Sequence, residues 1–417
     1  MEIGNAIAIV LGGTNDHITL IEKLKLKGYF TTLIDYNDNP PAKEFADEYI
    51  RESTLDKEKI LEIAREKQAG LVIATCIDQA LLTVAYVSEQ LGLPCHLTYE
   101  QALNLTNKAY MKKVFIENGI PTSQYLIIED ENYSLDKLPL FKFPLVVKPA
   151  DANSSKGIKR VDTNSELAEA VAEAFTFSRS KKVVIEEFVN GLELSVDVVI
   201  KDRQADIILV TENIKNTNNK SNFTIVQNTF NINVFDRYKS RLKKIAEDIA
   251  SAFEIGNGPL LIQLLADDEQ LSVIEFSSRI GGGSKHHFIY KISSFDMLGY
   301  FVDVIAGENS EVQTYYPNKF ASINYIYTKP GKISKFEGFD LLVEQNIIHQ
   351  YFYYKTAGML VTNHISSADR PAGYMVVDNN IGRLNERMDT AGKTLKVISD
   401  QGHNMIINGL HQHLTEF

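Results

Sequence analysis

Residues 145–157 have the sequence LVVKPADANSSKG, a short apolar β pattern that ends at Lys148 and continues into a loop of small and polar residues. Such a loop lets backbone N–H groups approach phosphate oxygens, because little side-chain bulk lies between them. Thr163 and Glu166 have the spacing of a capping box, which predicts that a helix begins there. The stretch therefore predicts a strand, a loop suited to phosphates and a helix in succession.

A second buried strand is predicted at residues 183–185, and it continues into the sequence EEFVNGLE at 186–193. Backbone groups at the 186–189 bend could pair with the edge of an adenine. Glu193, seven residues after Glu186, could accept hydrogen bonds from ribose hydroxyls. A solvated turn with exposed charges is the alternative for each of these residues alone, because exposure is the usual fate of Lys and Glu.

This segment resembles the nucleotide-binding core of the ATP-grasp superfamily. The resemblance implies ATP as the cofactor, with Lys148 on the phosphates, Glu186 and Val189 at the adenine and hinge positions, and Glu193 on the ribose. The predicted helix 108–117, with Thr106 as its N-cap, resembles the family's entry helix. The full set of cofactor-binding residues implied is Lys108, Lys148, Ser154, Ser155, Gly157, Glu186, Glu187, Phe188, Val189 and Glu193.

Residues 260–265 and 271–277 read as two antiparallel strands joined by an acidic turn. Because residues two apart share a face of a strand, Glu275 and Ser277 should point the same way, with Gln263 opposite them. Mg²⁺ prefers hard oxygen ligands and commonly uses one or two carboxylates together with phosphates. The resemblance makes Gln263, Glu275 and Ser277 the expected ligands for Mg²⁺ or Mn²⁺. Ser277 replaces the family's usual Asn, which puts a second metal ion in doubt.

Arg279 fits the family's arginine that steadies the transferred phosphoryl group, so it joins Lys148 as an expected catalytic residue. The glycine run that follows permits close backbone approach. Gly282, Gly283 and His286 are the candidate substrate residues, although adjacent histidines at a helix start are more often structural. Residues 213–223 are polar, lack a buried pattern and suit either a loop that closes over substrate or an unimportant excursion.

Composition narrows the class of protein. The 417 residues have a net charge of −11, which argues against nucleic-acid binding because phosphate neutralisation needs clustered Lys and Arg. No apolar run is long enough for a membrane span and no signal peptide is evident, so neither a membrane partner nor secretion is expected. Cys76 and Cys95 lie in apolar surroundings that suggest buried thiols in a reducing cytoplasm.

The predicted fold class is α/β: an ATP-grasp fold with an N-terminal doubly wound parallel, Rossmann-like domain and a small C-terminal α+β domain. The expected domains are residues 1–105, the nucleotide-binding core 106–320 with a small lobe at about 123–195, and residues 321–417. The first βαβ unit also suggests a dinucleotide-binding site. That signal is weak, because the unit has only the adjacent Gly12 and Gly13 instead of three spaced glycines.

The leading hypothesis is an ATP- and magnesium-dependent carboxylate–amine ligase, similar to L-amino-acid ligases, biotin carboxylase and the carbamoyl-phosphate synthetase large subunit. It would join a small carboxylate to an amine through an acyl-phosphate, and the resemblance also admits a homodimer. Three alternatives stay open: a carbamoyl-phosphate-synthetase-like enzyme favoured by Gln263, a non-catalytic ATP sensor suggested by Ser277, and a Rossmann oxidoreductase.

Overall fold

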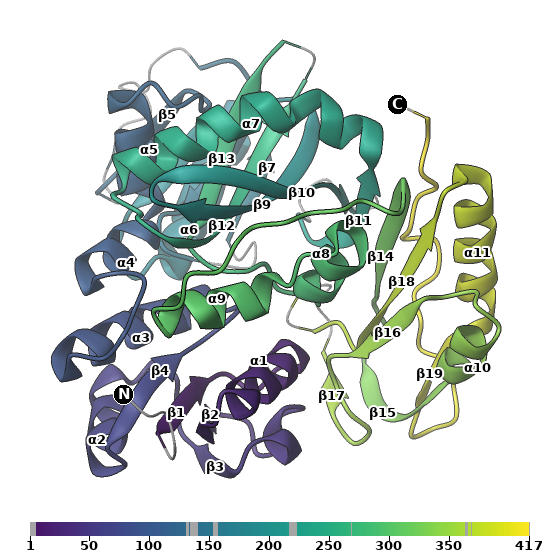
Figure 1. Ribbon diagram of the computed structural model, residues 1–417. Helices are drawn as coiled ribbons and strands as arrows, with labels where there is room; N and C mark the ends of the chain where they lie inside the picture. The colour runs from purple at the N-terminus through teal and green to yellow at the C-terminus, as the bar shows by residue number, and fades with distance from the viewer. Residues whose placement is uncertain are drawn as a thin grey trace.

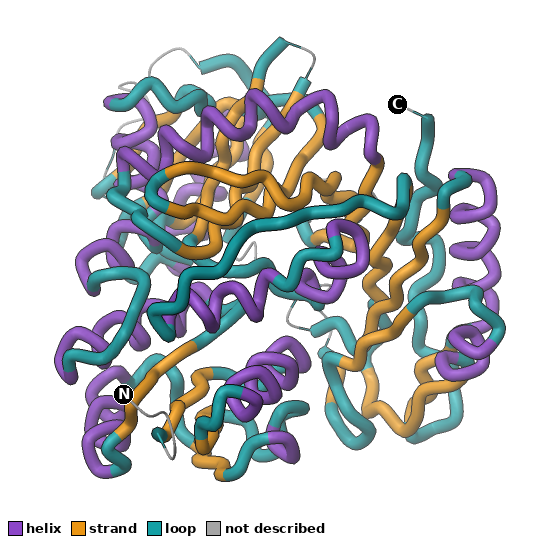
Figure 2. Tube along the Cα trace, viewed as in Figure 1, coloured by secondary structure: helices purple, strands orange, loops and turns teal. Residues whose placement is uncertain are grey.

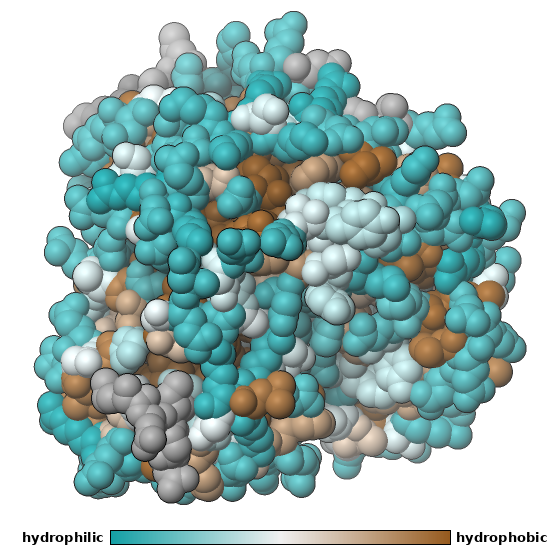
Figure 3. All heavy atoms as spheres, in the orientation of Figure 1, coloured by the Kyte–Doolittle hydropathy of each residue, from teal (hydrophilic) through white to brown (hydrophobic). Residues whose placement is uncertain are grey.

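The computed structural model describes residues 6–130, 133, 141–152, 157–216, 223–267, 269–362, 366–367 and 369–416. Its elements form an N-terminal parallel sheet, a small antiparallel sheet, and a large antiparallel sheet that continues into the C-terminal part of the chain. Figure 2 shows helices lying over the faces of these sheets. On the face drawn in Figure 3, hydrophilic residues predominate. No described helix is both long and apolar enough to cross a membrane.

The N-terminal sheet is parallel and has the strand order β3-β2-β1-β4. Its β-α-β pattern comes from short apolar runs that alternate with amphipathic helices, as the sequence predicts. The elements are β1 (Ile7–Leu11), α1 (Asn15–Leu26), β2 (Phe30–Asp35), η1 (Lys43–Phe45), β3 (Glu48–Arg51), α2 (Lys57–Glu66), β4 (Ala69–Ile73) and α3 (Asp78–Leu91). The N-terminus of α3 follows the carboxyl end of β4, and in the turn between them the thiol of Cys76 donates to the carbonyl of Gly281.

Two helices, α4 (Tyr99–Leu105) and α5 (Lys108–Glu117), lead into the small sheet, whose strand order is β5-β8-β6-β7. Its elements are β5 (Tyr125–Ile128), β6 (Leu145–Pro149), β7 (Lys159–Val161), α6 (Asn164–Phe177) and β8 (Val183–Glu187). Helix α6 forms where the sequence predicts a helix, and it buries Leu167, Val171, Ala174 and Phe175 along one face.

Two predicted caps differ in detail. Asn107 caps α5 by accepting from the N–H of Tyr110, whereas Thr106 ends the preceding helix α4, which the sequence pattern did not reveal. Thr163 begins α6 but makes no side-chain cap bond, because its hydroxyl bonds Ser165. The reciprocal capping box is therefore not formed.

The large sheet has the order β13-β12-β9-β10-β11-β14-β18-β16, and every neighbouring pair is antiparallel. Helix α7 (Ile232–Ala252) packs on it and buries Val234, Phe235 and Tyr238 in its first two turns. The strands and remaining helices are β9 (Leu192–Lys201), β10 (Gln204–Lys215), β11 (Ile225–Asn231), β12 (Gly258–Ala266), β13 (Leu271–Ser277), α8 (Lys285–Ser293), α9 (Met297–Ile305), β14 (Phe320–Ile326), β16 (Gln350–Tyr353) and β18 (Ala372–Asp378).

The C-terminal part adds a second layer beside the large sheet. A three-stranded sheet with the order β17-β15-β19 packs with two helices around its own apolar cluster. Its elements are β15 (Gly331–Glu337), α10 (Phe339–Glu344), β17 (Leu360–Val361), α11 (Ile381–Thr394) and β19 (Lys396–Ser399). Strand β14 nevertheless pairs with β11, and β18 pairs with β14, so the sheet crosses the boundary predicted at residue 320.

The largest apolar core runs through the whole molecule. It joins residues on one face of the N-terminal sheet to α5, to the large sheet and to α7, α8 and α9. Cys76 and Cys95 are free thiols of intermediate exposure, whereas the sequence suggested buried thiols.

Candidate active site

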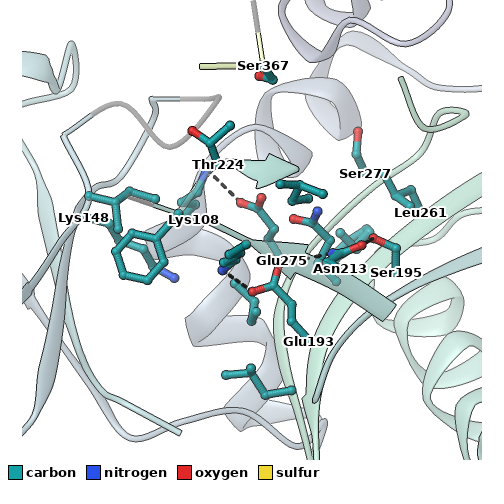
Figure 4. Close-up of a pocket in the computed structure, with 18 of the residues that line it drawn as sticks. Lys108, Lys148, Glu193, Ser195, Asn213, Thr224, Leu261, Glu275, Ser277 and Ser367 are labelled. Atoms are coloured by element: carbon teal, nitrogen blue, oxygen red, sulfur yellow. Dashed lines mark hydrogen bonds and ion pairs between the residues drawn. The ribbon is translucent and has the colours of Figure 1, made fainter. Parts of the chain in front are cut away.

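A cavity of about 1050 Å³ lies between the small sheet, the large sheet and the N-terminus of α3. Twelve of the predicted site residues line it: Lys108, Lys148, Glu186, Glu187, Phe188, Val189, Glu193, Gln263, Glu275, Ser277, Arg279 and Gly282. Figure 4 shows Lys108 and Lys148 on one side and Glu193, Ser195 and Asn213 on the other. Residues that are far apart in the sequence therefore line one cleft.

Lys148 ends strand β6, and its Nζ lies 2.5 Å from Glu186 Oε1 on the neighbouring strand β8. The other oxygen of Glu186 is 2.7 Å from Nζ of Lys112, a fully buried lysine of α5, and 3.0 Å from the hydroxyl of Ser123. Burial acts to raise the pKa of Glu186, but the charges of Lys112 and Lys148 outweigh it and lower that pKa to about 2. Glu186 is thus a buried carboxylate anion that joins two lysines.

Lys108 begins α5, and its Nζ lies 3.0 Å from Glu275 on β13 and 3.0 Å from the carbonyl of Ala152. Gln263 is directly opposite Glu275 in the β12–β13 register, as the strand pattern predicts. Burial acts to raise the pKa of Glu275, but the charges of Lys108 and Lys148 lower it. This end of the cavity therefore holds an ionised carboxylate beside two cationic side chains.

Glu193 at the start of β9 is bound by two side chains of β10. Asn213 donates to Glu193 Oε1 at 3.1 Å, and Lys215 pairs with Oε2. The sequence suggested a loop without a buried pattern from residue 213. In the structure Asn213 is buried, and residues 213–215 belong to strand β10.

The hydrogen bonds continue from Asn213 through the sheet. Asn228 donates to Asn213 Oδ1 at 2.6 Å, and the hydroxyl of Tyr325 donates to Asn228 Oδ1 at 2.8 Å. Tyr325 also lies 3.2 Å from the carbonyl of Gly283. A buried polar chain thus crosses β9, β10, β11 and β14, from Glu193 to the glycine run.

Arg279 follows β13 and forms an ion pair with Asp78 at the N-terminus of α3. One guanidinium nitrogen lies 2.6 Å from Asp78 Oδ2, and Nε bonds Oδ1. Burial acts to raise the pKa of Asp78, but Arg279 lowers it, and the hydroxyl of Ser277 also donates to that carboxylate. The N-terminal sheet thereby supplies a direct contact to the predicted catalytic arginine.

Other predicted residues lie elsewhere or outside the described residues. Ser154 and Ser155 belong to the latter group. Gly157 does not line the cavity: a Cβ there would lie 2.7 Å from Phe177, so packing explains its small size. Gly283 and His286 are likewise absent from the lining. His286 is buried against His287, with 4.1 Å between ring centroids, and burial lowers its pKa to about 4.

Several lining or supporting residues were not singled out from the sequence, among them Lys112 and Arg370. Lys112 had a detectable signal, because it lies one helical turn after Lys108 and therefore shares its face. Arg370 had none, because it lies in an irregular segment before β18 with no periodic pattern.

Comparisons with known proteins agree with this fold. Residues 114–254 match the family described as D-ala D-ala ligase C-terminus. A D-alanine–D-alanine ligase of Thermosipho africanus is 28% identical over 204 residues, which cover 45% of this chain and 53% of that ligase. The match thus spans about half the length of this curated relative.

Two further proteins extend the similarity over more of the chain. The large chain of carbamoyl phosphate synthase from Clostridium acetobutylicum is 22% identical over 289 residues, 69% of this chain and 27% of that protein. The crystal structure of L-amino acid ligase from Bacillus licheniformis superimposes with a TM-score of 0.78 at 19% identity, over 95% of this chain and 99% of that one. The cleft between two antiparallel sheets, the lysines that enter it and these similarities all point to the ATP-grasp superfamily.

Proposed function

We propose that this protein is an ATP-dependent ligase that joins a small carboxylate to an amine through an acyl-phosphate. The observation that carries the proposal is the convergence of Lys108, Lys148, Glu193, Glu275 and Arg279 on one cavity. Its volume, about 1050 Å³, is at the upper end of ordinary ligand pockets, which suits a nucleotide together with a second small molecule.

The proposed reaction has two steps. An oxygen of the carboxylate attacks the γ-phosphorus of ATP, the bond to the β-phosphate oxygen breaks, and ADP leaves. The amine nitrogen then attacks the acyl carbon, the bond to the phosphate oxygen breaks, and phosphate leaves while the nitrogen loses a proton to water. Such chemistry depends mostly on positioning and charge neutralisation, so no nucleophile from the protein is needed.

The side chains of the cleft suit these tasks. Lys108 of α5 and Lys148 of β6 lie on one side of the cavity and would neutralise the phosphates, while Arg279 would stabilise the charge on the transferred phosphoryl group. Glu193, already bound by Asn213 and Lys215, would accept hydrogen bonds from the ribose hydroxyls. The Glu186–Val189 stretch lies where the adenine would bind.

The oxygen donors fit one Mg²⁺ ion. Glu275 offers a carboxylate and Gln263 an amide oxygen on adjacent strands, and nucleotide phosphates would complete a set of hard oxygen ligands. Mg²⁺ would there offset the negative charge of the phosphates. Ser277 shares its hydroxyl with Asp78, so its role as a ligand for a second ion stays a prediction. The described residues hold no group of three or more His, Cys, Asp or Glu suited to a metal.

A phosphate-release screen over pairs of small carboxylic acids and amines tests the proposal. The expected result is ADP and phosphate formation only with the right pair, with at least a hundredfold loss in Lys148→Ala. Lys59→Ala, at an exposed ion pair on α2, is the matched control and should keep full activity. ATP binding without turnover in any mixture would contradict a ligase and favour the sensor.

Gln263 and the match to the carbamoyl phosphate synthase large chain favour a second candidate, phosphorylation of bicarbonate. ATP turnover stimulated by bicarbonate in the absence of any amine would support it. The same screen distinguishes the two, because the ligase requires both a carboxylate and an amine.

A further inference from the structure

The cavity extends past Arg279 to a wall that comes from the C-terminal part of the chain. Tyr325 of β14, Ser367 and Arg370 of the segment before β18, and Gln412 line this wall. In Figure 4, Ser367 lies apart from Lys108 and Lys148, on another side of the cavity. This end is connected to the nucleotide end by the glycine run at residues 281–283.

The backbone that carries Arg370 is fixed on both sides. Asp369, the preceding residue, is buried and accepts hydrogen bonds from the backbone and hydroxyl of Thr362, and it pairs with Lys355 at 3.0 Å. The carbonyl of Pro371, the following residue, accepts from the N–H groups of Tyr354 and Lys355. Arg370 therefore lies between two hydrogen-bonded residues, which lowers the entropic cost of binding a ligand there.

The guanidinium of Arg370 has aromatic neighbours in place of a carboxylate partner. It lies 4.1 Å from the ring centroid of Tyr325 and 4.9 Å from that of Tyr354, and it contacts the hydroxyl of Tyr327. No ion pair joins it to an acidic side chain within the described ranges. Arg279 differs in this respect, because it pairs with Asp78.

Nearby acidic groups are already engaged. Asp16 accepts from the backbone N–H groups of Gly283 and Ser284, at 3.2 and 2.8 Å. Asp197 pairs with Lys285 at 3.3 Å. Contact with aromatic faces leaves the N–H donors of a guanidinium available, so Arg370 keeps most of its capacity to bind an anion.

The absence of a side chain at Gly283 leaves room for the guanidinium of Arg370. A Cβ on Gly283 would lie 2.8 Å from Nη2 of Arg370 and 2.7 Å from the hydroxyl of Tyr325, and φ is +78° at this position. A side chain there would push both groups away. Because four residues span at most about 14 Å, Arg370 beside Gly283 lies within reach of a small molecule that reacts near Arg279.

We propose that Arg370 binds the free carboxylate of the amine substrate, so that this substrate is an amino acid. A planar guanidinium matches a carboxylate through two parallel hydrogen bonds, and the aromatic rings hold its plane. The anchored carboxylate directs the amino group along the glycine run toward the acyl-phosphate. This inference rests on the proposed ligase activity.

The test compares L-amino acids with the corresponding L-amino acid amides as amines in the phosphate-release assay, with product detection by mass spectrometry. The wild-type protein should use the acids and lose about 10- to 100-fold in kcat/KM with the amides. Arg370→Gln should raise the KM for the amino acid by a similar factor, leave the KM for ATP unchanged, and erase the preference for acid over amide.

Arg383→Gln is the matched control, because Arg383 is an exposed arginine of α11 that pairs with Asp378. Equal use of acids and amides by the wild type, or an unchanged KM in Arg370→Gln, would overturn the inference while leaving the ligase intact. If no acid–amine pair supported turnover, the ligase proposal would fail, and the inference would fail with it. A thermal melt and the KM for ATP show whether Arg370→Gln is folded.

Discussion

Asp78, a residue 201 positions earlier in the chain, accepts two hydrogen bonds from one edge of the Arg279 guanidinium, from Nε and from Nη2. Asp78 lies at the first turn of α3, and Arg279 follows the end of β13. The ion pair therefore fixes the arginine from the N-terminal part of the chain. We expect Asp78 to be a positioning residue, which acts through Arg279 in the proposed reaction.

Asp78→Asn should lower kcat by about 10- to 100-fold with a smaller change in the KM for ATP. The reason is that a hydrogen bond to a charged group contributes about 1.5–3 kcal/mol, and its loss frees Arg279 to leave the phosphoryl position. Steady-state kinetics measure both constants. Asp38→Asn, at an exposed residue in the bend after β2, is the control and should match the wild type. An unchanged kcat in Asp78→Asn would show that Arg279 needs no such support.

Lys112→Met should destabilise the fold by about 3 kcal/mol and raise the KM for ATP, because it leaves the buried Glu186 with one lysine partner instead of two. Denaturant unfolding measures the stability. Lys113→Met, at the exposed neighbouring position on α5, should change stability by less than about 0.5 kcal/mol. Restoration of the KM by Lys112→Arg would show that the positive charge orients Glu186 and Lys148. Equal effects at positions 112 and 113 would contradict the prediction.

Glu275→Gln should raise the Mg²⁺ concentration needed for half-maximal ATP turnover by at least about tenfold, because the site loses its only carboxylate ligand among the proposed three. EDTA should abolish turnover in the wild type, and added Mg²⁺ should restore it. The surface variant Glu62→Gln serves as the control. If the Mg²⁺ titrations of Glu275→Gln and the wild type coincide, the metal binds elsewhere.

The protein should lose stability as the pH falls from about 6.5 to about 4. Burial lowers the pKa of His17, His96, His286 and His287 from 6.5 to about 4 in the folded protein. Between those values the unfolded chain binds more protons than the folded one, so the stability is fully present above pH 6.5 and decreases below it. Each histidine contributes a slope of at most about 1.4 kcal/mol per pH unit.

His286→Gln should reduce the slope of unfolding free energy against pH by up to one proton in this window. His403→Gln, at an exposed histidine, should leave the slope unchanged. Urea unfolding at a series of pH values measures it. A slope in His286→Gln equal to that of the wild type would mean that His286 is not a buried neutral group.

Periodic patterns predicted the parts of the site that lie on regular strands. The pairing of Gln263 with Glu275 follows from two alternating apolar runs and a short acidic turn, because an antiparallel hairpin fixes its own register. Lys148 at the end of β6 follows from the same reasoning. The ATP-grasp fold was confirmed by the structural similarity, whereas the site roles and the domain boundaries stay predictions.

Contacts between distant segments had no local signal. The pairing of Asp78 with Arg279 depends on how two sheets pack. The sequence around each residue does not distinguish it from an ordinary solvent-exposed charged residue. Asn213 appeared to belong to a polar loop because five asparagines follow one another closely, yet burial beside Asn228 makes it part of a strand. Thr106 and Asn107 are adjacent capping residues, and only the helix that ends at Leu105 decides between them.

The large sheet has a further consequence for how this protein can change. Strand β14 hydrogen-bonds to β11 on one side and to β18 on the other, so the strands that carry Glu193 and those that flank Arg370 form one continuous ladder. Recombination between relatives could not exchange the last hundred residues as an independent module, because a foreign β14 would have to match β11 residue for residue. Preference for a new amine substrate should therefore arise by point substitution along the cavity wall of Tyr325, Ser367, Arg370 and Gln412, and not by the transfer of a whole segment.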